Sequence, residues 1–363
     1  MSGETVVIGT YTSGGGSRGI YAAEWDGAGV LGTPRLLAEM KNPSFVAPHP
    51  SLPLLYAASE TGRFEGRDSG AVAVVRPGSQ GAVTVLLRDS GGTSPCHVAV
   101  DPRGGFLVVS NYGSGSAAVF PLVDGVPGDP VAVMQFEGHG PDPKRQEGPH
   151  AHSAFFDPTG DRFYVQDLGT DRIYGFALDR AARSVRPLDP PFFRLAAGSG
   201  PRHMAFHPGG PRAYVINELD NTVTALGWDR ETGALAPLQT VNALPADASG
   251  PSYCADIHVS SDGAFLYGSN RGHDSIAAWR IGPENGGLAL VQHASCGGKH
   301  PRSFCLSPDN RWLLCANMDS DNIVVFRRDP STGILAQTAD ISASKPVCLL
   351  FLPFRPGGRP VSG

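Results

Sequence analysis

The stretch Gly200-Pro201-Arg202-His203-Met204-Ala205-Phe206-His207-Pro208-Gly209-Gly210-Pro211-Arg212-Ala213-Tyr214-Val215-Ile216-Asn217-Glu218 contains the repeating unit of this chain. Two short apolar runs flank a His-Pro-Gly-Gly turn, which is the pattern of a β-hairpin. Polar side chains stand at the two open ends of the hairpin. The unit that decides the fold therefore also carries candidates for chemistry.

This unit recurs at intervals of about 50 residues. When the copies are aligned on the turn, the second apolar run ends at Ser59, Asn111, Asp167, Asn217, Asn270 and Asn317. A seventh copy is divided between the ends of the chain: Pro346 to Phe351 matches a first run, and Val6 to Tyr11 matches a second. Third and fourth runs follow the hairpin, so each repeat has four short strands. This pattern predicts an all-β fold, a seven-bladed β-propeller with four-stranded antiparallel blades, closed by N- and C-terminal strands in one blade.

We expect a single domain over residues 1–363, because no linker or change in composition interrupts the repeats. The chain has 47 Gly and 32 Pro residues and only 17% charged residues, which suits a fold rich in tight turns. No segment of ten or more residues has convincing helical periodicity. The six cysteines lack CxxC spacing and several fall in apolar runs, so we interpret them as buried, reduced thiols.

Charge and composition narrow the possible partners. The formal net charge is −5 and there is no basic run, which argues against a nucleic acid or an anionic membrane and favours a small solute. The first residues lack the basic and apolar regions of a signal peptide, and no apolar stretch approaches the ~20 residues that a membrane span needs. We therefore predict a cytoplasmic protein.

Antiparallel connectivity predicts where the chemistry lies. The start of each first strand, the end of each second strand and the following loop share one face, whereas the turn with His49 or His207 lies on the other. First strands converge on the propeller channel, so residues of different blades meet in one pocket. Six of the eleven histidines fall on that face. The candidates there are His97, Lys144, Arg145, His150, His152, Arg202, His203, Glu218, Arg271, His273, Lys299 and Arg302, together with Glu147, Asp256 and His300.

The roles of these candidates have alternatives. Glu218 is either a catalytic base or substrate anchor, or one half of a structural ion pair. Arg202 has a counterpart in Arg302, so one of the two can be a tether between blades. The first strand after Pro149 has two extra residues, and His150 and His152 would look into the same space, either as functional groups or as two satisfied structural histidines.

A metal site is not expected. His150, His152 and Glu218 could ligate zinc, but no HExxH-type or cysteine-rich spacing supports it. Neither a Walker loop nor a GxSxG motif in a strand-to-helix setting occurs, so nucleotide binding and a serine nucleophile find no support in the sequence. We expect no cofactor.

Several motifs together resemble the seven-bladed propeller lactonases, the family of the propeller-type 6-phosphogluconolactonase and of carboxymuconate cyclase. The resemblance covers essentially the whole chain. The motifs are Gly9-Thr10-Tyr11-Thr12, Asn42-Pro43-Ser44-Phe45, Pro149-His150-Ala151-His152-Ser153, Gly200-Pro201-Arg202-His203, Asn217-Glu218-Leu219, Ser269-Asn270-Arg271-Gly272-His273-Asp274-Ser275 and His300-Pro301-Arg302.

The resemblance implies a metal-independent lactonase with a site of one histidine, two arginines and one glutamate. On this chain these roles map to His150 or His152, Arg202, Arg271 and Glu218. The expected substrate is a small anionic sugar lactone, most directly 6-phosphogluconolactone, and the pathway is then the pentose phosphate pathway.

The residues suggest how the reaction would run. Arginines would bind the oxyanion or a substrate anion, and a histidine near its unperturbed pKa of about 6.5 would be the general base, oriented by an ionised Glu218. Lys144, Arg145, Lys299 and Arg302 are secondary anion ligands. Two other classes stay open. One is a cyclase that forms a lactone from a carboxymuconate with the same groups. The other is a non-enzymatic propeller that binds a protein or peptide and would show exposed aromatic residues at the mouth.

Overall fold

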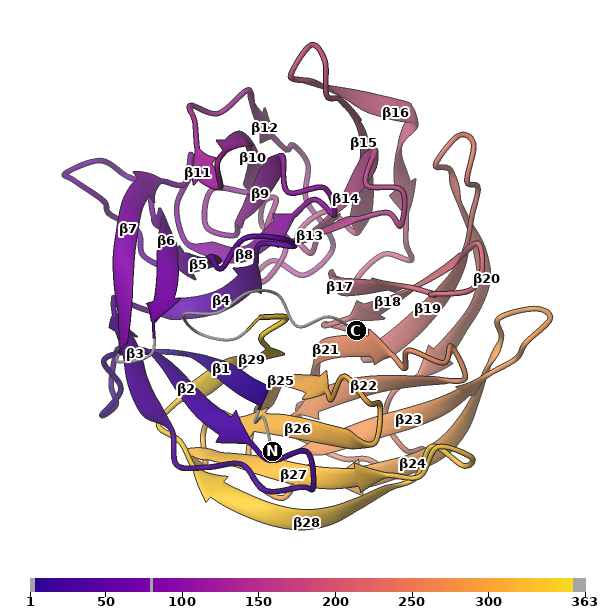
Figure 1. Ribbon diagram of the computed structural model, residues 1–363. Coiled ribbons are helices and arrows are strands. Elements are labelled where there is room, and N and C mark those ends of the chain that lie inside the picture. Colours follow the sequence, from indigo (N-terminus) through magenta and orange to yellow (C-terminus); the bar gives the residue numbers. More distant parts are fainter. Residues whose placement is uncertain (1–3, 79–80, 355–363) are drawn as a thin grey trace.

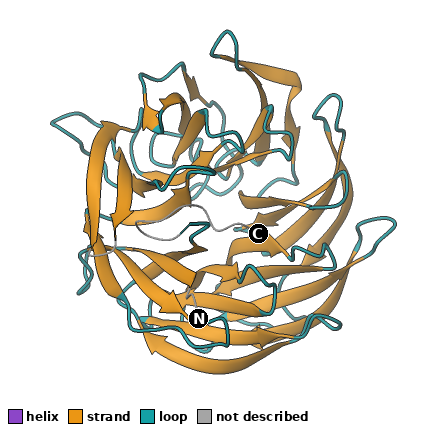
Figure 2. Ribbon diagram, viewed as in Figure 1, coloured by secondary structure: helices purple, strands orange, loops and turns teal. Residues whose placement is uncertain are grey.

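The computed structural model describes residues 4–78 and 81–354, which form strands joined by loops (Figure 2). These strands build seven antiparallel sheets arranged as a ring (Figure 1). The predicted seven-bladed propeller is confirmed. Residues 1–3, which were part of the argument about a targeting signal, and residues 355–363 lie outside the described residues. Within the described part of the chain, no helix is long and apolar enough to cross a bilayer.

Each blade is one sheet, and we number the blades in chain order. Blade 1 consists of β29 (Pro346–Phe351), β1 (Glu4–Thr10), β2 (Gly19–Trp25) and β3 (Arg35–Glu39). Blade 2 consists of β4 (Pro43–Pro48), β5 (Leu55–Ser59), β6 (Ala71–Gly78) and β7 (Gly81–Asp89). Blade 3 consists of β8 (Pro95–Val100), β9 (Phe106–Asn111), β10 (Ser116–Val123), β11 (Val126–Pro127) and β12 (Ala132–Gln135).

The other four blades follow the same plan. Blade 4 consists of β13 (Ala151–Phe156), β14 (Arg162–Asp167), β15 (Arg172–Asp179) and β16 (Ser184–Arg194). Blade 5 consists of β17 (Pro201–Phe206), β18 (Arg212–Asn217), β19 (Thr222–Trp228) and β20 (Leu235–Asn242). Blade 6 consists of β21 (Tyr253–Val259), β22 (Phe265–Arg271), β23 (Ser275–Ile281) and β24 (Leu288–Ser295). Blade 7 consists of β25 (Pro301–Leu306), β26 (Trp312–Asn317), β27 (Asn322–Arg328) and β28 (Leu335–Ser342).

The fourth strand of blade 3 departs from the plan of four unbroken strands. It is split into β11 and β12, which pair with different parts of β10. The break contains Gly128, Asp129 and Pro130. Pro130 has no N–H with which to continue the ladder, so the chain leaves the sheet and rejoins it.

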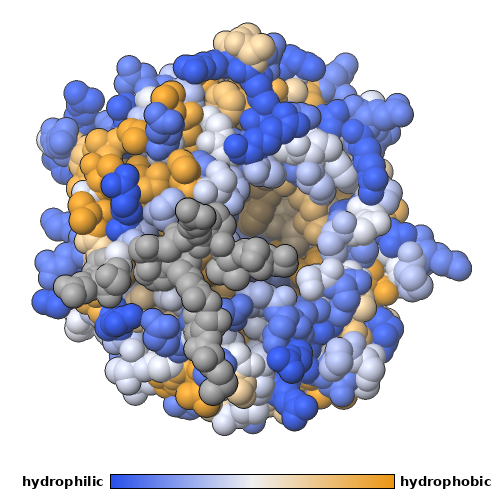
Figure 3. Space-filling model, in the orientation of Figure 1, coloured by the Kyte–Doolittle hydropathy of each residue, from blue (hydrophilic) through white to orange (hydrophobic). Residues whose placement is uncertain are grey.

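The ring is closed by strands from the two ends of the described chain. β1 pairs with β29 through Val6 to Phe351, Val7 to Leu350, Ile8 to Leu349 and Gly9 to Cys348. The predicted split repeat is therefore confirmed. The first strand of every blade contacts the first strands of both neighbours, so these seven strands enclose the channel. The space-filling view shows the ring hollowed near its centre (Figure 3).

Within residues 4–78 and 81–354, the hydrophobic core consists of seven clusters, one between each pair of neighbouring blades. Successive residues of a strand point to opposite faces of its sheet, so β18 serves two clusters. Ala213 and Val215 pack against blade 4, whereas Tyr214 and Ile216 pack against blade 6. All six cysteines are buried and free, as the sequence predicted. The blades are thus held by apolar seams, and side chains that face the channel are free to carry polar groups.

Candidate active site

A β-bulge near the start of every first strand leaves a residue unpaired, and the side chain of that residue turns toward the channel. Pro201 pairs with Asn217 and His203 with Ile216, so Arg202 has no partner of its own across the ladder. A register shift occurs at the same place in all seven blades, and in blade 6 it spans two residues, Ala255 and Asp256. A bulge bends the strand and re-aims the extra side chain. The equivalent residues, from blade 1 to blade 7, are Val347, Ser44, Cys96, His152, Arg202, Ala255 and Arg302.

A second set of equivalent positions follows the polar residue that ends each second strand. Glu218 comes after Asn217, and Arg271 comes after Asn270. From blade 1 to blade 7 these residues are Tyr11, Glu60, Tyr112, Leu168, Glu218, Arg271 and Met318. The two sets together form two rings of side chains at the mouth of the channel. We call them the bulge ring and the strand-end ring.

Glu218 is the centre of a buried ion cluster and is only 3% exposed. Its Oε2 lies 3.0 Å from Arg202 Nε and 2.7 Å from Arg271 Nη2, and Arg145 Nη2 pairs with Oε1. Burial would raise the pKa of this carboxyl, but Arg271, Arg202 and Arg145 hold it well below its usual range. Glu218 is therefore ionised, as expected, and is a weak proton acceptor.

The backbone holds Glu218 through the turn before β17. Its N–H donates to Gly200 O at 2.7 Å. Gly200 has a φ of 62°, and a Cβ there would come within 2.6 Å of Leu219 Cγ. The glycine that opens the repeated motif is thus required for the conformation that positions the carboxylate.

Arg202 and Arg271 each keep part of the guanidinium unused. Arg202 is 2% exposed and donates from Nη1 to Ala255 O at 2.7 Å, while Arg271 donates from Nη2 to Cys254 O at 2.9 Å. Burial, with the charges of Arg271 and Arg302, lowers the pKa of Arg202, and the pairing with Glu218 favours its charged form. The described residues supply no acceptor for Arg202 Nη2 or Arg271 Nη1. These nitrogens can meet a ligand.

Arg145 comes from the long connection between blades 3 and 4. Asp142 Oδ1 accepts from the N–H groups of Lys144 and Arg145, and buried Gln146 donates to Leu168 O at 2.8 Å and to Asp171 Oδ1 at 2.7 Å. The connection is thereby fixed, and Arg145 reaches Glu218 while its Cζ lies 5.6 Å from the ring centroid of Tyr253.

The two candidate histidines of blade 4 have different surroundings. His150 Nδ1 lies 3.0 Å from Tyr112 O and Nε2 lies 3.2 Å from Glu147 Oε1, so both of its nitrogens are engaged. His152 occupies the bulge ring and is 4% exposed. The described residues supply no hydrogen-bond partner to its buried Nδ1. Of the two, His152 is the imidazole with hydrogen-bonding capacity left over.

The expected extra residues in the first strand of blade 4 are not there. β13 and β17 have six residues each, and Ala151 pairs with Asp167 as Pro201 pairs with Asn217. The prediction was wrong because it aligned Pro149 with Pro201. The additional residues lie before the strand, in the connection that carries Arg145.

The pKa of His152 also differs from the expectation of an ordinary value. Burial, followed by the charge of Arg202, lowers the pKa of His152 well below 6.5. The imidazole is therefore neutral at physiological pH and a weaker base than a solvent-exposed histidine.

His203 and His97 are buried beside the ion cluster, with their ring centroids 5.5 Å apart. His203 Nδ1 lies 2.9 Å from Asp256 Oδ1, and its Nε2 lies 3.3 Å from Arg202 Nη1. Burial and Arg202 lower the pKa of His203 to about 4. His97 stacks on Phe45, with ring centroids 4.0 Å apart, and is buried. His203 therefore contacts Arg202 directly, and His97 packs against His203.

A separate polar cluster forms across blades 7, 1 and 2. Tyr11 donates its hydroxyl hydrogen to Glu60 Oε2 at 2.8 Å, and Arg302 Cζ lies 5.3 Å from the Tyr11 ring centroid. Tyr11 and Glu60 were not among the candidates expected from the sequence, and neither was Tyr112, whose pKa is raised by burial against the influence of the nearby Arg145. A signal was present, since all three immediately follow a second-strand end.

Three candidates lie away from the ion cluster. Lys144 and Lys299 are exposed. His273 turns toward the outer part of blade 6, with Nδ1 2.8 Å from Ser275 Oγ. Among the described residues, Glu218 pairs with Arg145, Arg202 and Arg271 and with none of these three side chains.

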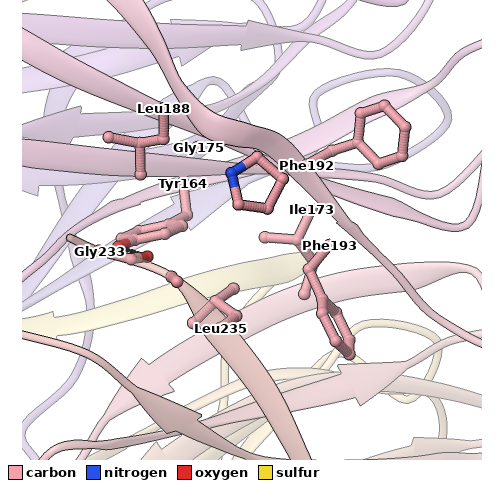
Figure 4. A pocket seen from close by; sticks show the side chains of 10 residues that line it. Tyr164, Ile173, Gly175, Leu188, Phe192, Phe193, Gly233 and Leu235 are labelled. Atoms are coloured by element: carbon pink, nitrogen blue, oxygen red, sulfur yellow. Dashed lines mark hydrogen bonds between the residues drawn. The ribbon is translucent and has the colours of Figure 1, made fainter.

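A small apolar pocket lies elsewhere, between blades 4 and 5 (Figure 4). Tyr164, Leu188 and Phe192 line it together with the Gly233 turn. Tyr164 donates its hydroxyl hydrogen to Gly233 O at 2.6 Å, and equivalent bonds join Tyr56 to Gly125, Tyr214 to Gly286 and Tyr267 to Gly333. The pocket belongs to a repeated seam and offers no catalytic group.

The residues do not group as metal ligands. Within the described ranges, no cluster of three or more histidine, cysteine, aspartate or glutamate residues could hold a metal ion. The side chains that can act on a ligand at this site are the guanidinium groups, Glu218 and the neutral imidazole of His152.

Comparison with known proteins gives one consistent family. The family model described as Lactonase, 7-bladed beta-propeller matches residues 5–351. A 6-phosphogluconolactonase of Bacillus subtilis is 38% identical over 349 residues, which are 95% of this chain and 97% of that relative. Another, from Formosa agariphila, is 36% identical over 340 residues, 90% of this chain and 93% of the relative. The solved structure of the Pseudomonas aeruginosa periplasmic gluconolactonase superimposes with a TM-score of 0.88 at 32% identity, covering 97% of this chain and 99% of that one.

Proposed function

The chain belongs to the seven-bladed β-propeller lactonase family, and from that premise we propose that it is a hydrolase that opens 6-phosphogluconolactone to 6-phosphogluconate. Relatives that align over almost their whole length carry that name. The observation that carries the proposal is the cluster of Arg145, Arg202 and Arg271 around one carboxylate, beside the neutral His152. The reaction belongs to the pentose phosphate pathway, and the cytoplasm stays our predicted location.

The mouth of the channel suits an anionic substrate although the whole chain is acidic. Three guanidinium groups share Glu218, so the cluster keeps an excess of positive charge. Guanidinium groups bind carboxylate and phosphate oxygens with paired hydrogen bonds. A sugar lactone with an acidic substituent is therefore favoured over a neutral one.

Hydrolysis begins with attack of water on the lactone carbonyl carbon. His152 takes the water proton as a general base, which its neutral state allows. The carbonyl oxygen becomes an oxyanion, and the unused N–H groups of Arg202 and Arg271 stabilise that charge. The bond from the carbonyl carbon to the ring oxygen then breaks, and protonated His152 returns its proton to the leaving alkoxide. The product is a hydroxy acid.

Glu218 orients the arginines in this scheme and does not take the proton. Its low pKa makes it a poor base at neutral pH, whereas its two oxygens fix three guanidinium groups in the buried site. A set of donors held in place before the reaction needs no reorganisation when the oxyanion forms. The carboxylate is thus a positioning residue.

The direct test is a kinetic panel with 6-phosphogluconolactone, gluconolactone and a carboxymuconate. We expect kcat/KM to be largest for the phosphorylated lactone. Arg202→Lys and Arg271→Lys should each lower kcat by roughly 100-fold because the planar fork is lost. Arg311→Lys, whose side chain is exposed and pairs only with Asp309 among the described residues, is the matched control.

The panel also separates the alternatives. Conversion of the muconate with no lactone hydrolysis would assign the chain to the cyclases. Absence of turnover on every compound would favour a binding protein. That alternative expects aromatic residues free at the mouth, whereas the exposed Tyr253 is covered by Arg145.

A further inference from the structure

Arg302 differs from the other three arginines at the mouth. Arg145, Arg202 and Arg271 all pair with Glu218. Around Arg302, no carboxylate of residues 4–78 or 81–354 lies within 4.0 Å, and no hydrogen bond from its guanidinium group is found to them. A partly buried guanidinium group without an anionic partner is costly unless a ligand supplies one.

The surroundings keep this group charged and oriented. Arg302 occupies the bulge ring of blade 7, and its Cζ lies 5.3 Å from the Tyr11 ring centroid. Tyr11 is fixed in turn by its hydrogen bond to Glu60. Burial opposes the charge of Arg302, yet Tyr11 and Glu60 raise its pKa above the ordinary value. A face-on aromatic ring holds a guanidinium plane while leaving its N–H groups available.

The charge balance of the mouth points to a doubly charged ligand. Four guanidinium groups lie near Glu218 and Glu60, which leaves two positive charges. The nearby Asp256 is paired with His258 and, against the effect of burial, raises the pKa of that histidine. A phosphate monoester carries about −1.5 to −2 charges at neutral pH, whereas a sugar carboxylate carries one. A neutral lactone would leave both positive charges uncompensated.

We propose that Tyr11, Glu60 and Arg302 form a phosphate subsite, in which Arg302 binds the phosphate group of the lactone and determines specificity for phosphorylated substrates. This inference rests on the proposed function and adds to it. Arg202 and Arg271 act on the lactone carbonyl, and Arg302, in blade 7, holds the opposite end of the substrate. Arg302 is close enough to Arg202 to lower its pKa but is not joined to the Glu218 cluster by an ion pair.

The test compares two substrates that differ only in the phosphate, 6-phosphogluconolactone and gluconolactone. Arg302→Gln should lower kcat/KM for the phosphorylated lactone by about 100-fold or more, mainly through KM, because a buried charge pair is lost. The value for gluconolactone should change by less than about threefold, since that substrate never used the pair. Arg311→Gln, an exposed arginine outside the channel mouth, should leave both values unchanged. Equal losses on the two lactones, or no loss on either, would overturn the proposal.

A second experiment needs no variant and so does not depend on folding of Arg302→Gln. Phosphite dianion, added to the wild-type protein with gluconolactone, should increase turnover by occupying the empty subsite. Inorganic phosphate should compete with the phosphorylated substrate, and this competition should weaken in Arg302→Lys, which keeps the charge and loses the fork. Absence of any effect of phosphite and phosphate on the wild type would count against the subsite. A wild type that hydrolyses neither lactone would instead contradict the proposed function.

Discussion

His207 and His152 lie at opposite ends of first strands and have different kinds of partner. His207 Nε2 lies 3.0 Å from Gly263 O of the next blade, and its Nδ1 accepts from Gly209 N–H at 3.0 Å. His49 makes the same contacts, with Gly104 O and with Ser51 and Leu52 N–H. His152 has no such repeated role and lies beside charged side chains. Side-chain contacts with the backbone that recur in different blades stabilise the ring. The site is built from side chains that differ from the residues at equivalent positions in the other blades.

The largest effect that would test this contrast is the loss of His152. His152→Gln should lower kcat for the lactone by about 10²- to 10⁴-fold, the usual contribution of a general base. The melting temperature should stay close to that of the wild type, because the described residues give this imidazole no hydrogen bond. Steady-state kinetics and thermal unfolding measure the two quantities. Turnover within a few-fold of the wild type would remove His152 from the mechanism.

Glu218→Gln should affect both stability and activity. The change leaves three guanidinium groups around an uncharged amide, and removal of one partner of a buried ion pair costs about 3–5 kcal/mol. Turnover should fall too, since the arginines lose their orientation. Urea unfolding and kcat measure these effects. Asp309→Asn, which breaks the exposed pair with Arg311, is the control and should cost less than about 1 kcal/mol. An equally small loss for both variants would contradict the buried cluster.

His207→Ala probes the structural end of the same repeat. It removes two hydrogen bonds to backbone groups, each worth about 1 kcal/mol, so the free energy of unfolding should drop by about 2 kcal/mol. We expect kcat and KM to be unchanged. A lower kcat in a variant that is still fully folded would show that the turn side is coupled to the channel mouth.

The smallest effect concerns pH. His152 must be neutral to accept a proton, and its pKa is held below the ordinary value, so protonation requires a more acidic solution. The kcat for gluconolactone should therefore be constant from about pH 7 to about pH 6 and fall only at lower pH. Gluconolactone is the substrate of choice because its lack of phosphate removes a second titration in this range. An acid limb centred at or above about pH 6.5, after subtraction of spontaneous hydrolysis, would assign the base to another group.

The fold was accessible from sequence because each repeat has the same turn and the same period. The polar residue that ends each second strand was predicted in six blades, and β5, β9, β14, β18, β22 and β26 reach those residues. The β-bulges were not predicted, because a single unpaired residue leaves no mark in a pattern of apolar alternation. For that reason His150 and His152 could not be separated, and Pro149 was aligned with Pro201 although Ala151, two residues later, is the equivalent residue.

Long-range contacts account for what else was missed at the site. Arg145 was a secondary candidate because nothing in a polar loop of residues 136–150 indicates that one arginine reaches Glu218. Burial, followed by the charge of Arg202 from another blade, lowers the pKa of His152, and an isolated motif reveals neither cause. The members of the site could be predicted from residue type and from position in the repeat. Their roles could be assigned only from the contacts between blades.

The pairing of β1 with β29 links the order of folding to the order of synthesis. Blades 2 to 7 are built from neighbouring stretches of chain, so each can form locally as it leaves the ribosome. Blade 1 needs residues from both ends, and its loop-closure entropy is the largest in the molecule. Until β29 arrives, the inner edge of β1 is an open template for pairing with another chain. The final step of folding thus also protects the nascent protein from aggregation.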